Sequence, residues 1–331
     1  MQIKTLFFGS PEFGLTILKS LLSLEYIEMV GVVTQPDKEF GRKKILKATK
    51  VKEYVSKEYP EIKIFCPTKL KEDAQSILDE TKPELIIVAS YGKILPEIII
   101  NYPKYRCLNI HGSLLPLLRG AIPVQMAILK GFETTGVSVQ IMKMEMDQGD
   151  IIFTRSIPIE NTDTSGILMN KLADIGSEII QKDLIQYIEG KTQALAQDNS
   201  KATYCYLTEL SYEKAQIDWN QSIVQVSRKI RAFNPNPIAY SNGLVIKLMD
   251  KFECNIQISG KVKIIDSSAA EKINLSEIPE NINLQSGDGI VQNQKLYIKT
   301  IDDFICILKL QLEGKNVVSS AEYINGLKNK I

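Results

Sequence analysis

Histidine is nearly absent from this chain of 331 residues, in which His111 is the single one. Because imidazole is the side chain that gains and loses a proton most readily near neutral pH, acid–base chemistry of that kind is restricted to one position. An isolated histidine is more often a structural residue than a catalyst. The residues around His111 must therefore decide between the two roles.

Paired cysteines and long apolar runs are also absent. The five cysteines are scattered and form no C-x-x-C pair, which excludes a disulfide framework and a cysteine-based zinc site. The apolar opening of the chain is interrupted by Ser-Pro-Glu at 10–12, too early for a membrane span or a secretory signal. We therefore expect a cytoplasmic protein that has no membrane partner.

An excess of charge of one sign is absent as well, since 40 lysines and arginines accompany 39 acids and the net charge is +1. This balance excludes a surface that is basic all over, but not a local cluster. Residues 38–52 form such a cluster, with seven cations and the single acid Glu39. Turn-forming residues precede it, which favours an exposed basic loop that runs into a helix. These cations are either a solvated surface or a binding site for a polyanion.

Apolar segments typical of strands alternate with helical patterns in the first half of the chain. The strand-like segments are 2–9, 29–34, 63–66, 85–90 and 107–110, and helical patterns begin near Phe13, Lys50 and Lys69. Strands that alternate with helices pair in parallel through right-handed crossovers. The sequence therefore predicts an α/β fold with a doubly wound, mainly parallel, Rossmann-like sheet, in which ligands collect at the carboxyl ends of the strands.

The glycine turn after the first strand does not indicate a dinucleotide-binding sheet. Its sequence, Gly9-Ser10-Pro11-Glu12-Phe13-Gly14, lacks the G-x-G-x-x-G spacing. Pro11 also removes one of the amide donors that would hold a phosphate. We therefore do not expect a nicotinamide cofactor.

The second half of the chain has a different organisation. A helical pattern from Ser165 to about Gly190 ends the first domain, which we place at 1–190. Residues 191–206 are polar and aperiodic, as is typical of a linker. From 207 to 331, a helical start is followed by short alternating segments separated by Gly, Asn and Ser. This pattern predicts a smaller C-terminal β-barrel domain, similar to an OB fold.

Polar residues of catalytic type follow the segment 107–110. Asn109 and His111 are two residues apart on an extended segment, so their side chains project to the same side. An amide and an imidazole that converge on one oxygen atom stabilise the negative charge that develops on a reacting carbonyl. Asp147 lies in an Asp-x-Gly turn after the strand-like segment 137–142 and could supply a carboxylate, although taken alone it is a turn residue.

Longer motifs connect these residues to a known family. Three of them, Asn109-x-His111-x-Ser-Leu-Leu-Pro116, Arg119-Gly-Ala-x-Pro123 and Asp147-x-Gly-Asp150, resemble the folate-dependent formyltransferases. Within that family, the members that act on methionyl-tRNA share further motifs, which lie here at 8–13, 34–42, 91–96, 217–219, 230–235 and 311–315. The resemblance covers nearly the full chain.

The resemblance implies an enzyme that transfers the formyl group of 10-formyltetrahydrofolate to the α-amino group of methionyl initiator tRNA, for translation initiation. Asn109, His111 and Asp147 fall where the family has its catalytic residues. Asn109 and protonated His111 are expected to stabilise the oxyanion. Asp147 is expected to keep His111 charged and to relay a proton. The chemistry implies no metal.

The same resemblance places the binding residues, and we expect them to act in a monomer. The folate pocket is expected to be formed by one run and one loop: Ser113, Leu114, Leu115 and Pro116, with Val88, Tyr91, Gly92 and Leu95. Three basic residues are expected to contact the tRNA: Arg42, Lys43 and Lys44. The C-terminal domain is expected to hold more of the tRNA through its shape and phosphates.

Three alternatives stay open. The amine acceptor could belong to a sugar nucleotide or a ribonucleotide. Water could replace the amine, which would make the protein a 10-formyltetrahydrofolate hydrolase. The chain could also be a tRNA-binding protein without enzymatic activity. Two departures from the family pattern concern tRNA contacts and leave the catalytic residues untouched: Leu117-Leu118 replaces a basic or aromatic pair, and Asn236 replaces a tryptophan.

Overall fold

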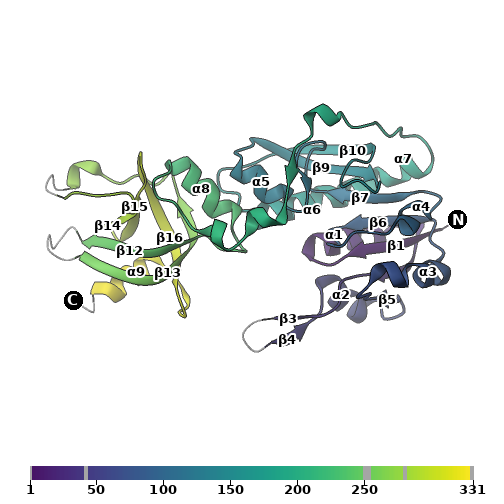
Figure 1. Ribbon diagram of the computed structural model, residues 1–331, viewed down its shortest axis with the longest axis horizontal. Helices are drawn as coiled ribbons and strands as arrows, with labels where there is room; N and C mark the ends of the chain where they lie inside the picture. Colours follow the sequence, from purple (N-terminus) through teal and green to yellow (C-terminus); the bar gives the residue numbers. More distant parts are fainter. Residues whose placement is uncertain (1, 41–43, 249–254, 279–281, 329–331) are drawn as a thin grey trace. The chain divides into compact units, whose positions relative to one another are not determined.

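The computed structural model describes residues 2–40, 44–248, 255–278 and 282–328, and the chain in it divides into two compact units (Figure 1). The N-terminal unit comprises residues 1–124, 133–159 and 168–205. The C-terminal unit comprises residues 125–132, 160–167 and 206–331. In the described part of the chain, no helix is both long and apolar enough to cross a membrane.

A seven-stranded sheet forms the centre of the N-terminal unit, in the order β10-β9-β7-β6-β1-β2-β5. Five neighbouring strands, from β7 to β5, pair in parallel, whereas β9 and β10 are antiparallel at one edge. The strands are β1 (Ile3–Gly9), β2 (Ile27–Val33), β5 (Ile64–Phe65), β6 (Leu85–Ala89), β7 (Cys107–His111), β9 (Thr134–Ile141) and β10 (Ile151–Pro158). The predicted mainly parallel sheet is confirmed.

The strand order reverses beside β1. The chain moves from β1 to β2 and β5 on one side, and later to β6 and β7 on the other. The loops at the carboxyl ends of β1 and β6 therefore diverge, which leaves room for a ligand above that edge of the sheet. Residues after β6 and β7 are placed at this edge.

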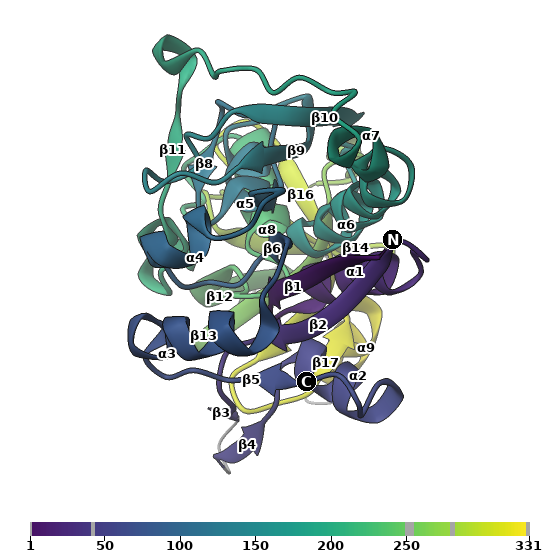
Figure 2. The same ribbon diagram turned by 90° about the vertical axis from the view of Figure 1, so that its right-hand side faces the viewer.

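Helices cover both faces of the sheet, as Figure 2 shows for the N-terminal unit. On one face lie α1 (Glu12–Leu22), α2 (Lys50–Glu58) and α6 (Ser165–Lys182), whose Gly176 packs so closely that an added Cβ would lie 2.8 Å from Ile17 and 3.2 Å from Ile110. On the other face lie α3 (Leu70–Thr81) and α4 (Glu97–Asn101). Apolar residues spaced three and four apart give α1 its buried side, including Phe13, Ile17 and Leu21.

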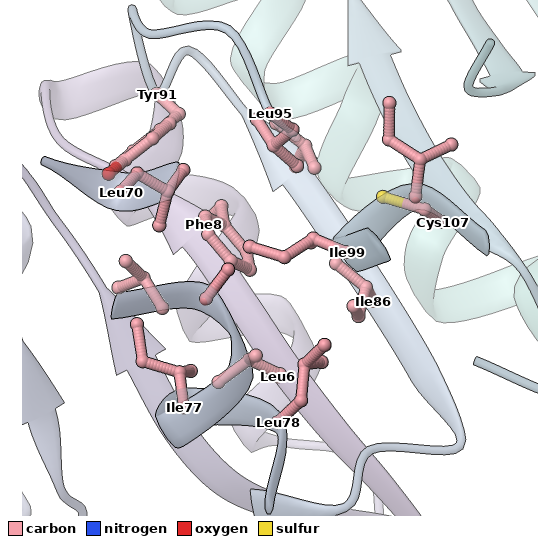
Figure 3. Close-up of a cluster of buried hydrophobic side chains, with 14 residues drawn as sticks. Leu6, Phe8, Leu70, Ile77, Leu78, Ile86, Tyr91, Leu95, Ile99 and Cys107 are labelled. Carbon is pink, nitrogen blue, oxygen red and sulfur yellow. The ribbon is translucent and has the colours of Figure 1, made fainter. Parts of the chain in front are cut away.

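The α3 and α4 face is held by one cluster of buried apolar side chains (Figure 3). Ile77 and Leu78 from α3 and Ile99 from α4 lie over Phe8 and Ile86 of the sheet. Burying aliphatic and aromatic side chains of this size contributes roughly 1.5–3 kcal/mol each. Cys107, at the start of β7, belongs to the same cluster, so this face of β7 is the one that α4 covers.

The last helical pattern of the N-terminal unit differs from the sequence prediction. The helix expected from Ser165 to about Gly190 is interrupted at Asp183, and α7 (Leu184–Ile188) follows as a separate helix. Asp183 accepts a hydrogen bond from Arg155 at 2.6 Å, and Leu184 is buried. The chain therefore turns where an aspartate, a weak helix former, meets a cation from the neighbouring strand.

The basic segment 38–52, which was predicted to be a loop that runs into a helix, also contains two short strands. The strands β3 (Lys38–Phe40) and β4 (Ile45–Lys47) pair in antiparallel orientation before α2 begins. Three-residue strands without an apolar face leave no periodic signal in the sequence, which is why the pattern predicts a loop there. The predicted exposure of the segment is confirmed, because Ile45 and Leu46 are 64% and 68% exposed.

The C-terminal unit is a small barrel, as predicted. Its sheet follows the order β13-β12-β14-β15-β16-β17, and β13 also pairs with β16, so five strands form a closed ring. The strands are β12 (Tyr240–Leu248), β13 (Asn255–Ser268), β14 (Asp288–Gln292), β15 (Lys295–Lys299), β16 (Phe304–Leu312) and β17 (Val317–Ser319). The helices α8 (Ile223–Ala232) and α9 (Ser320–Lys328) contact these strands. Closure pairs the strand edges that an open sheet would expose.

Candidate active site

Strand β7 places Asn109 and His111 on one face of the sheet. Leu108 and Ile110 alternate with them and are buried on the opposite face, where Ile110 approaches α6. Asn109 lies opposite Gln140 of β9, and His111 lies opposite Ser138. Because Cys107 is under α4 on the same face as Asn109 and His111, the two polar side chains lie just beyond this apolar cover, at the carboxyl end of the strand.

Asp147 reaches these residues from the loop between β9 and β10. Its carboxylate accepts three hydrogen bonds: Gly120 N–H donates to Oδ2 at 2.8 Å, and Gln140 Nε2 and Asn109 Nδ2 donate to Oδ1 at 2.9 and 3.3 Å. The side chain of Asp147 is 14% exposed. Its charge is therefore held in place by neutral donors, without a lysine or arginine directly attached to the carboxylate among these contacts.

The imidazole of His111 has two different sides. Nε2 lies 3.0 Å from the carbonyl oxygen of Leu118, which only accepts, so Nε2 carries a proton. Nδ1 faces Asp147 Oδ2 at 3.7 Å. The ring is therefore oriented by a backbone carbonyl, and Nδ1 is the nitrogen left for the carboxylate or for a substrate.

The loop after β7 is fixed by hydrogen bonds to its own backbone. Ser113 Oγ donates to Leu117 O at 2.6 Å, and Ser138 Oγ donates to Ser113 O at 2.8 Å while it accepts from Leu115 N–H at 3.0 Å. The Leu115–Pro116 peptide bond is cis. Ser113 and Leu115 are buried, whereas Leu114 and Pro116 are half-buried. All four predicted folate residues of this run thus lie directly beside His111 in the chain, on a well-anchored loop.

The other predicted folate residues lie in β6 and in the loop that follows it. The side chains of Val88, Tyr91 and Leu95 belong to the buried cluster of Figure 3, so the backbone of this loop and the exposed side chain of Ile94 are the parts that remain available to a ligand. Gln35 Nε2 donates to Tyr91 O at 2.7 Å. Gly92 has φ of 79°, and a Cβ there would lie 2.6 Å from Gln35 Nε2, so the position favours glycine.

Of the three basic residues predicted to contact tRNA, Arg42 and Lys43 lie outside the described residues. Lys44 is described, at the start of β4, with its side chain 77% exposed. Its Nζ lies 3.6 Å from Glu39 Oε2, and an exposed pair of this kind contributes about 0–1 kcal/mol. Lys44 is therefore a solvent-facing cation, remote in sequence from the residues around Asp147.

Three further residues complete the polar network, and the sequence motifs did not single them out for this role. Gln140 is buried in β9 and lies opposite Asn109. Arg119 begins β8 (Arg119–Gly120), which pairs in parallel with β11 (Tyr204–Cys205). Gln197 precedes β11, in the stretch predicted as a linker, and it donates to Asp147 O at 2.9 Å. Gln140 could have been identified as a neighbour of Asn109 if the pairing register of β7 and β9 had been known. Gln197 lies in aperiodic sequence, which gives no indication of its contacts.

No group of three or more His, Cys, Asp or Glu side chains suited to a metal ion occurs among the described residues. The donors that meet at Asp147 are amides and backbone N–H groups instead. Such an arrangement can hold an anion or stabilise charge that develops on an oxygen atom. One imidazole and one carboxylate, both capable of acid–base chemistry, lie 3.7 Å apart at this edge of the sheet.

Comparison with known proteins connects both units to one family. A family model described as formyl transferase matches residues 1–184, and one described as formyl transferase, C-terminal domain, matches residues 209–328. The methionyl-tRNA formyltransferase of Bacillus cytotoxicus is 34% identical over 333 residues, which covers 100% of this chain and 98% of that protein. The similarity therefore extends through both units.

Solved structures share the fold. An N-formyltransferase from Helicobacter canadensis, in complex with folinic acid and dTDP-3-aminofucose, is 20% identical with a TM-score of 0.63, and the match covers 92% of this chain and 98% of that one. HypX from Aquifex aeolicus, in complex with tetrahydrofolic acid, is 17% identical with a TM-score of 0.61. That match covers 100% of this chain and 48% of HypX, so the chain spans about half the length of HypX.

Proposed function

Because the chain belongs to the formyl transferase family in both its N-terminal and its C-terminal part, we propose that it transfers the formyl group of 10-formyltetrahydrofolate to the α-amino group of methionyl initiator tRNA. The product is the formylmethionyl-tRNA used for translation initiation. We further propose that the enzyme acts as a monomer in the cytoplasm. The whole-chain similarity to a methionyl-tRNA formyltransferase supports this acceptor over an amino sugar.

The observation that carries the proposal is the meeting of Asn109, His111 and Asp147 at the carboxyl end of β7. Asn109 Nδ2 lies 3.3 Å from Asp147 Oδ1, and His111 Nδ1 lies 3.7 Å from Asp147 Oδ2. An amide NH2 has two N–H groups, so Asn109 can bind Asp147 with one and a substrate oxygen with the other. The three side chains can thus act on one reacting centre.

Formyl transfer needs charge stabilisation more than a strong base. An α-amine has a pKa of roughly 7.7–8.0, so part of the acceptor is already a free base at neutral pH. When the amine attacks the formyl carbon, the formyl oxygen becomes negative. We assign two donors of hydrogen bonds to that oxygen: Asn109 Nδ2, and His111 Nδ1 when the imidazole is protonated at both nitrogens. Removing one such donor typically costs about 10²–10³-fold in rate.

Asp147 completes the proton balance. A bond forms between the methionyl nitrogen and the formyl carbon, and the bond between that carbon and the folate nitrogen breaks. One proton must leave the attacking nitrogen, and the departing folate nitrogen must gain one. Asp147 is the carboxylate beside the reacting centre, and it accepts and returns that proton, directly or through water.

The residues after β6 and β7 fit a folate. When bound, 10-formyltetrahydrofolate supplies the formyl group on a nitrogen that can leave. The backbone of 88–95 offers N–H and C=O groups at the edge of a buried apolar cluster, and Ile94 in that loop is 87% exposed. Leu114 and Pro116 on the facing loop are half-buried. Apolar side chains with a few fixed backbone groups suit a flat pterin ring.

Binding of the tRNA is proposed for two parts of the chain. The β3–β4 hairpin presents cations to solvent, among them Lys38 and Lys44. Arg42 and Lys43 share that segment in the sequence and are proposed to act with them. The barrel, which corresponds to the C-terminal domain of the family, is proposed to hold more of the acceptor through phosphate contacts.

Transfer of a radiolabelled formyl group from 10-formyltetrahydrofolate tests the proposal directly. The acceptors are methionyl initiator tRNA, methionyl elongator tRNA, a dTDP-amino sugar and water alone. We expect label on the initiator tRNA, at a rate well above that on the elongator tRNA. Label mainly on the amino sugar, or rapid release of formate without acceptor, would overturn the proposal in favour of a sugar formyltransferase or a hydrolase. Binding of tRNA without any transfer would indicate a non-catalytic protein.

A further inference from the structure

A buried arginine lies behind the candidate active site. Arg119 is 1% exposed, and its guanidinium donates to neutral acceptors. Nε and one terminal nitrogen donate to Gln197 Oε1 at 3.1 and 2.7 Å, and the guanidinium also donates to Asn199 Oδ1 at 2.7 Å and to Tyr204 OH at 3.3 Å. A buried charge is costly unless its donors are satisfied. These acceptors satisfy it from a single stretch of chain, residues 197–204.

The two bonds from Arg119 determine how the Gln197 amide is turned. Arg119 only donates, so the oxygen of the amide must face it, and the NH2 group must point the other way. On that side, Gln197 Nε2 donates to Asp147 O at 2.9 Å and to Gly149 O at 2.6 Å. Gln197 therefore connects the buried guanidinium to the turn that carries the catalytic carboxylate.

The turn that carries Asp147 has an unusual backbone conformation, which Gln197 contacts directly. Asp147 has φ of 54°, a left-handed conformation that few residues other than glycine, asparagine and aspartate adopt. Gly149 lies so close to β9 that a Cβ there would lie 1.7 Å from Ile141 O, so the position requires glycine. The backbone carbonyls of Asp147 and Gly149 are held by Gln197, while the side chain of Asp147 is held by Asn109, Gly120 and Gln140.

We propose that Gln197, oriented by Arg119, is a positioning residue for Asp147 in formyl transfer. The inference rests on the proposed function of Asp147 and extends it to a residue that lies 50 positions further along the chain. Gln197 touches no reacting atom. It fixes the direction of the carboxylate toward His111, and a displacement of about 1 Å in a catalytic group can cost around 10²-fold in rate.

Two substitutions test this role. Gln197→Glu keeps the shape and the acceptor for Arg119 but removes both N–H donors, and Gln197→Met removes donors and acceptor. We expect kcat to fall by about 10- to 100-fold in each, with little change in KM for tRNA, because the carboxylate is displaced while the binding surfaces stay intact. Gln193→Glu, in the same stretch of chain, is the matched control and should behave as wild type.

A functional double-mutant cycle separates positioning from a general structural role. If Gln197 acts through Asp147, Gln197→Glu should reduce kcat in the wild type but have almost no further effect in Asp147→Asn. Losses that multiply in the double variant would overturn the proposal. So would an unchanged kcat in Gln197→Glu, or loss of the wild-type circular dichroism in both Gln197 variants, because the residue would then serve folding instead.

The test of Gln197 can be distinguished from a failure of the proposed formyl transfer to methionyl-tRNA. Wild-type protein is assayed first on methionyl initiator tRNA. Absence of transfer to this tRNA would contradict the proposed acceptor, but not the role of Gln197. The ratio of variant to wild-type kcat is then measured on whichever acceptor, amine or water, the wild type uses. Ratios near one on the active acceptor would contradict the role of Gln197, whatever that acceptor is.

Discussion

The two units use their buried polar side chains in different ways. In the N-terminal unit, hydrogen bonds reach Asp147 from Asn109, Gly120 and Gln197, which are 38, 27 and 50 residues away. In the barrel, Thr300 Oγ1 bonds to Asp302 and to Asp303 O, two and three residues away, and the buried side chains of Ser241 and Gln292 bond to residues 15 to 22 positions away. The bonds in the N-terminal unit converge on Asp147, whose carboxylate lies 3.7 Å from the imidazole of His111, whereas those in the barrel join neighbouring segments and close turns. We therefore assign the chemistry to the first unit and a role in shaping the barrel to the polar groups of the second.

The strongest loss of activity should follow disruption of the network in the N-terminal unit. His111→Ala removes the only imidazole, and we expect kcat to fall by roughly 10²-fold or more without loss of fold. Single-turnover transfer of labelled formyl group measures it. The matched change in the barrel is Gln292→Leu, which removes a buried amide bonded to Asn274 and Glu277. A comparable loss of kcat in Gln292→Leu would contradict the division of roles.

A more moderate change is expected in the barrel and concerns stability. The single tryptophan, Trp219, donates its Nε1–H to Ser241 Oγ at 3.0 Å. Ser241→Ala leaves this buried donor without its acceptor, which we expect to cost about 1–3 kcal/mol in the free energy of unfolding. Trp219 fluorescence follows the barrel during urea unfolding. At saturating tRNA, the folded variant should transfer formyl groups with the kcat of the wild type. A fall in kcat would show that this barrel residue affects catalysis as well as stability.

Tyr91→Phe should affect stability in the opposite direction. The hydroxyl of Tyr91 is buried and has no hydrogen-bond partner in the described part of the chain. Its ring packs edge-on against the ring of Phe8, with 5.3 Å between the two ring centroids. Removing an unsatisfied hydroxyl should stabilise the N-terminal unit by about 1 kcal/mol. Thermal unfolding near pH 7 measures the difference, and a clear destabilisation would show that the hydroxyl has a favourable role.

The same substitution predicts a pH dependence. Burial raises the pKa of Tyr91 to about 12, above the ordinary value of about 10. The stability linked to the neutral phenol is therefore present below pH 10 and is lost as the pH rises toward 12. Over that range we expect the wild type to lose more stability than Tyr91→Phe. Parallel pH profiles of the two proteins would contradict the assignment.

The weakest effect concerns the basic hairpin. Lys44→Gln should raise KM for tRNA a few-fold and leave kcat unchanged, because it removes one exposed cation far in sequence from the reacting centre. The slope of log KM against log salt should fall by about one if Lys44 binds one phosphate. Lys57→Gln, on α2, is the control with an equally exposed cation. Equal effects of the two substitutions would indicate general electrostatic attraction instead of a site.

Local patterns in the sequence were enough to predict the parallel strands of the first unit and the helices between them. Alternation of strands and helices predicted the parallel sheet, and the spacing of Asn109 and His111 placed both on one face of β7. Apolar residues report the periodicity of the element that contains them, so such predictions need no knowledge of distant contacts. The break at Asp183 was not predicted because it depends on Arg155, which approaches from another strand.

The remainder of the network could not be predicted because it depends on register and on long-range bonds. Gln140 joins Asn109 only once β7 and β9 are paired in a particular register. Gln197 lies in polar sequence typical of a linker, yet it contacts the loop of Asp147. A residue whose partners are 48 to 78 positions away leaves no local pattern.

Nitrogen NMR of the single histidine, labelled with ¹⁵N in the imidazole, is the decisive test of the proposed site, because only one pair of ring signals is present. We predict a proton on Nε2, bonded to Leu118 O, and an Nδ1 signal that shifts both in Asp147→Asn and when 5-formyltetrahydrofolate is added. A proton on Nδ1 with a bare Nε2, or an Nδ1 signal indifferent to the aspartate and to the folate, would contradict the proposed arrangement.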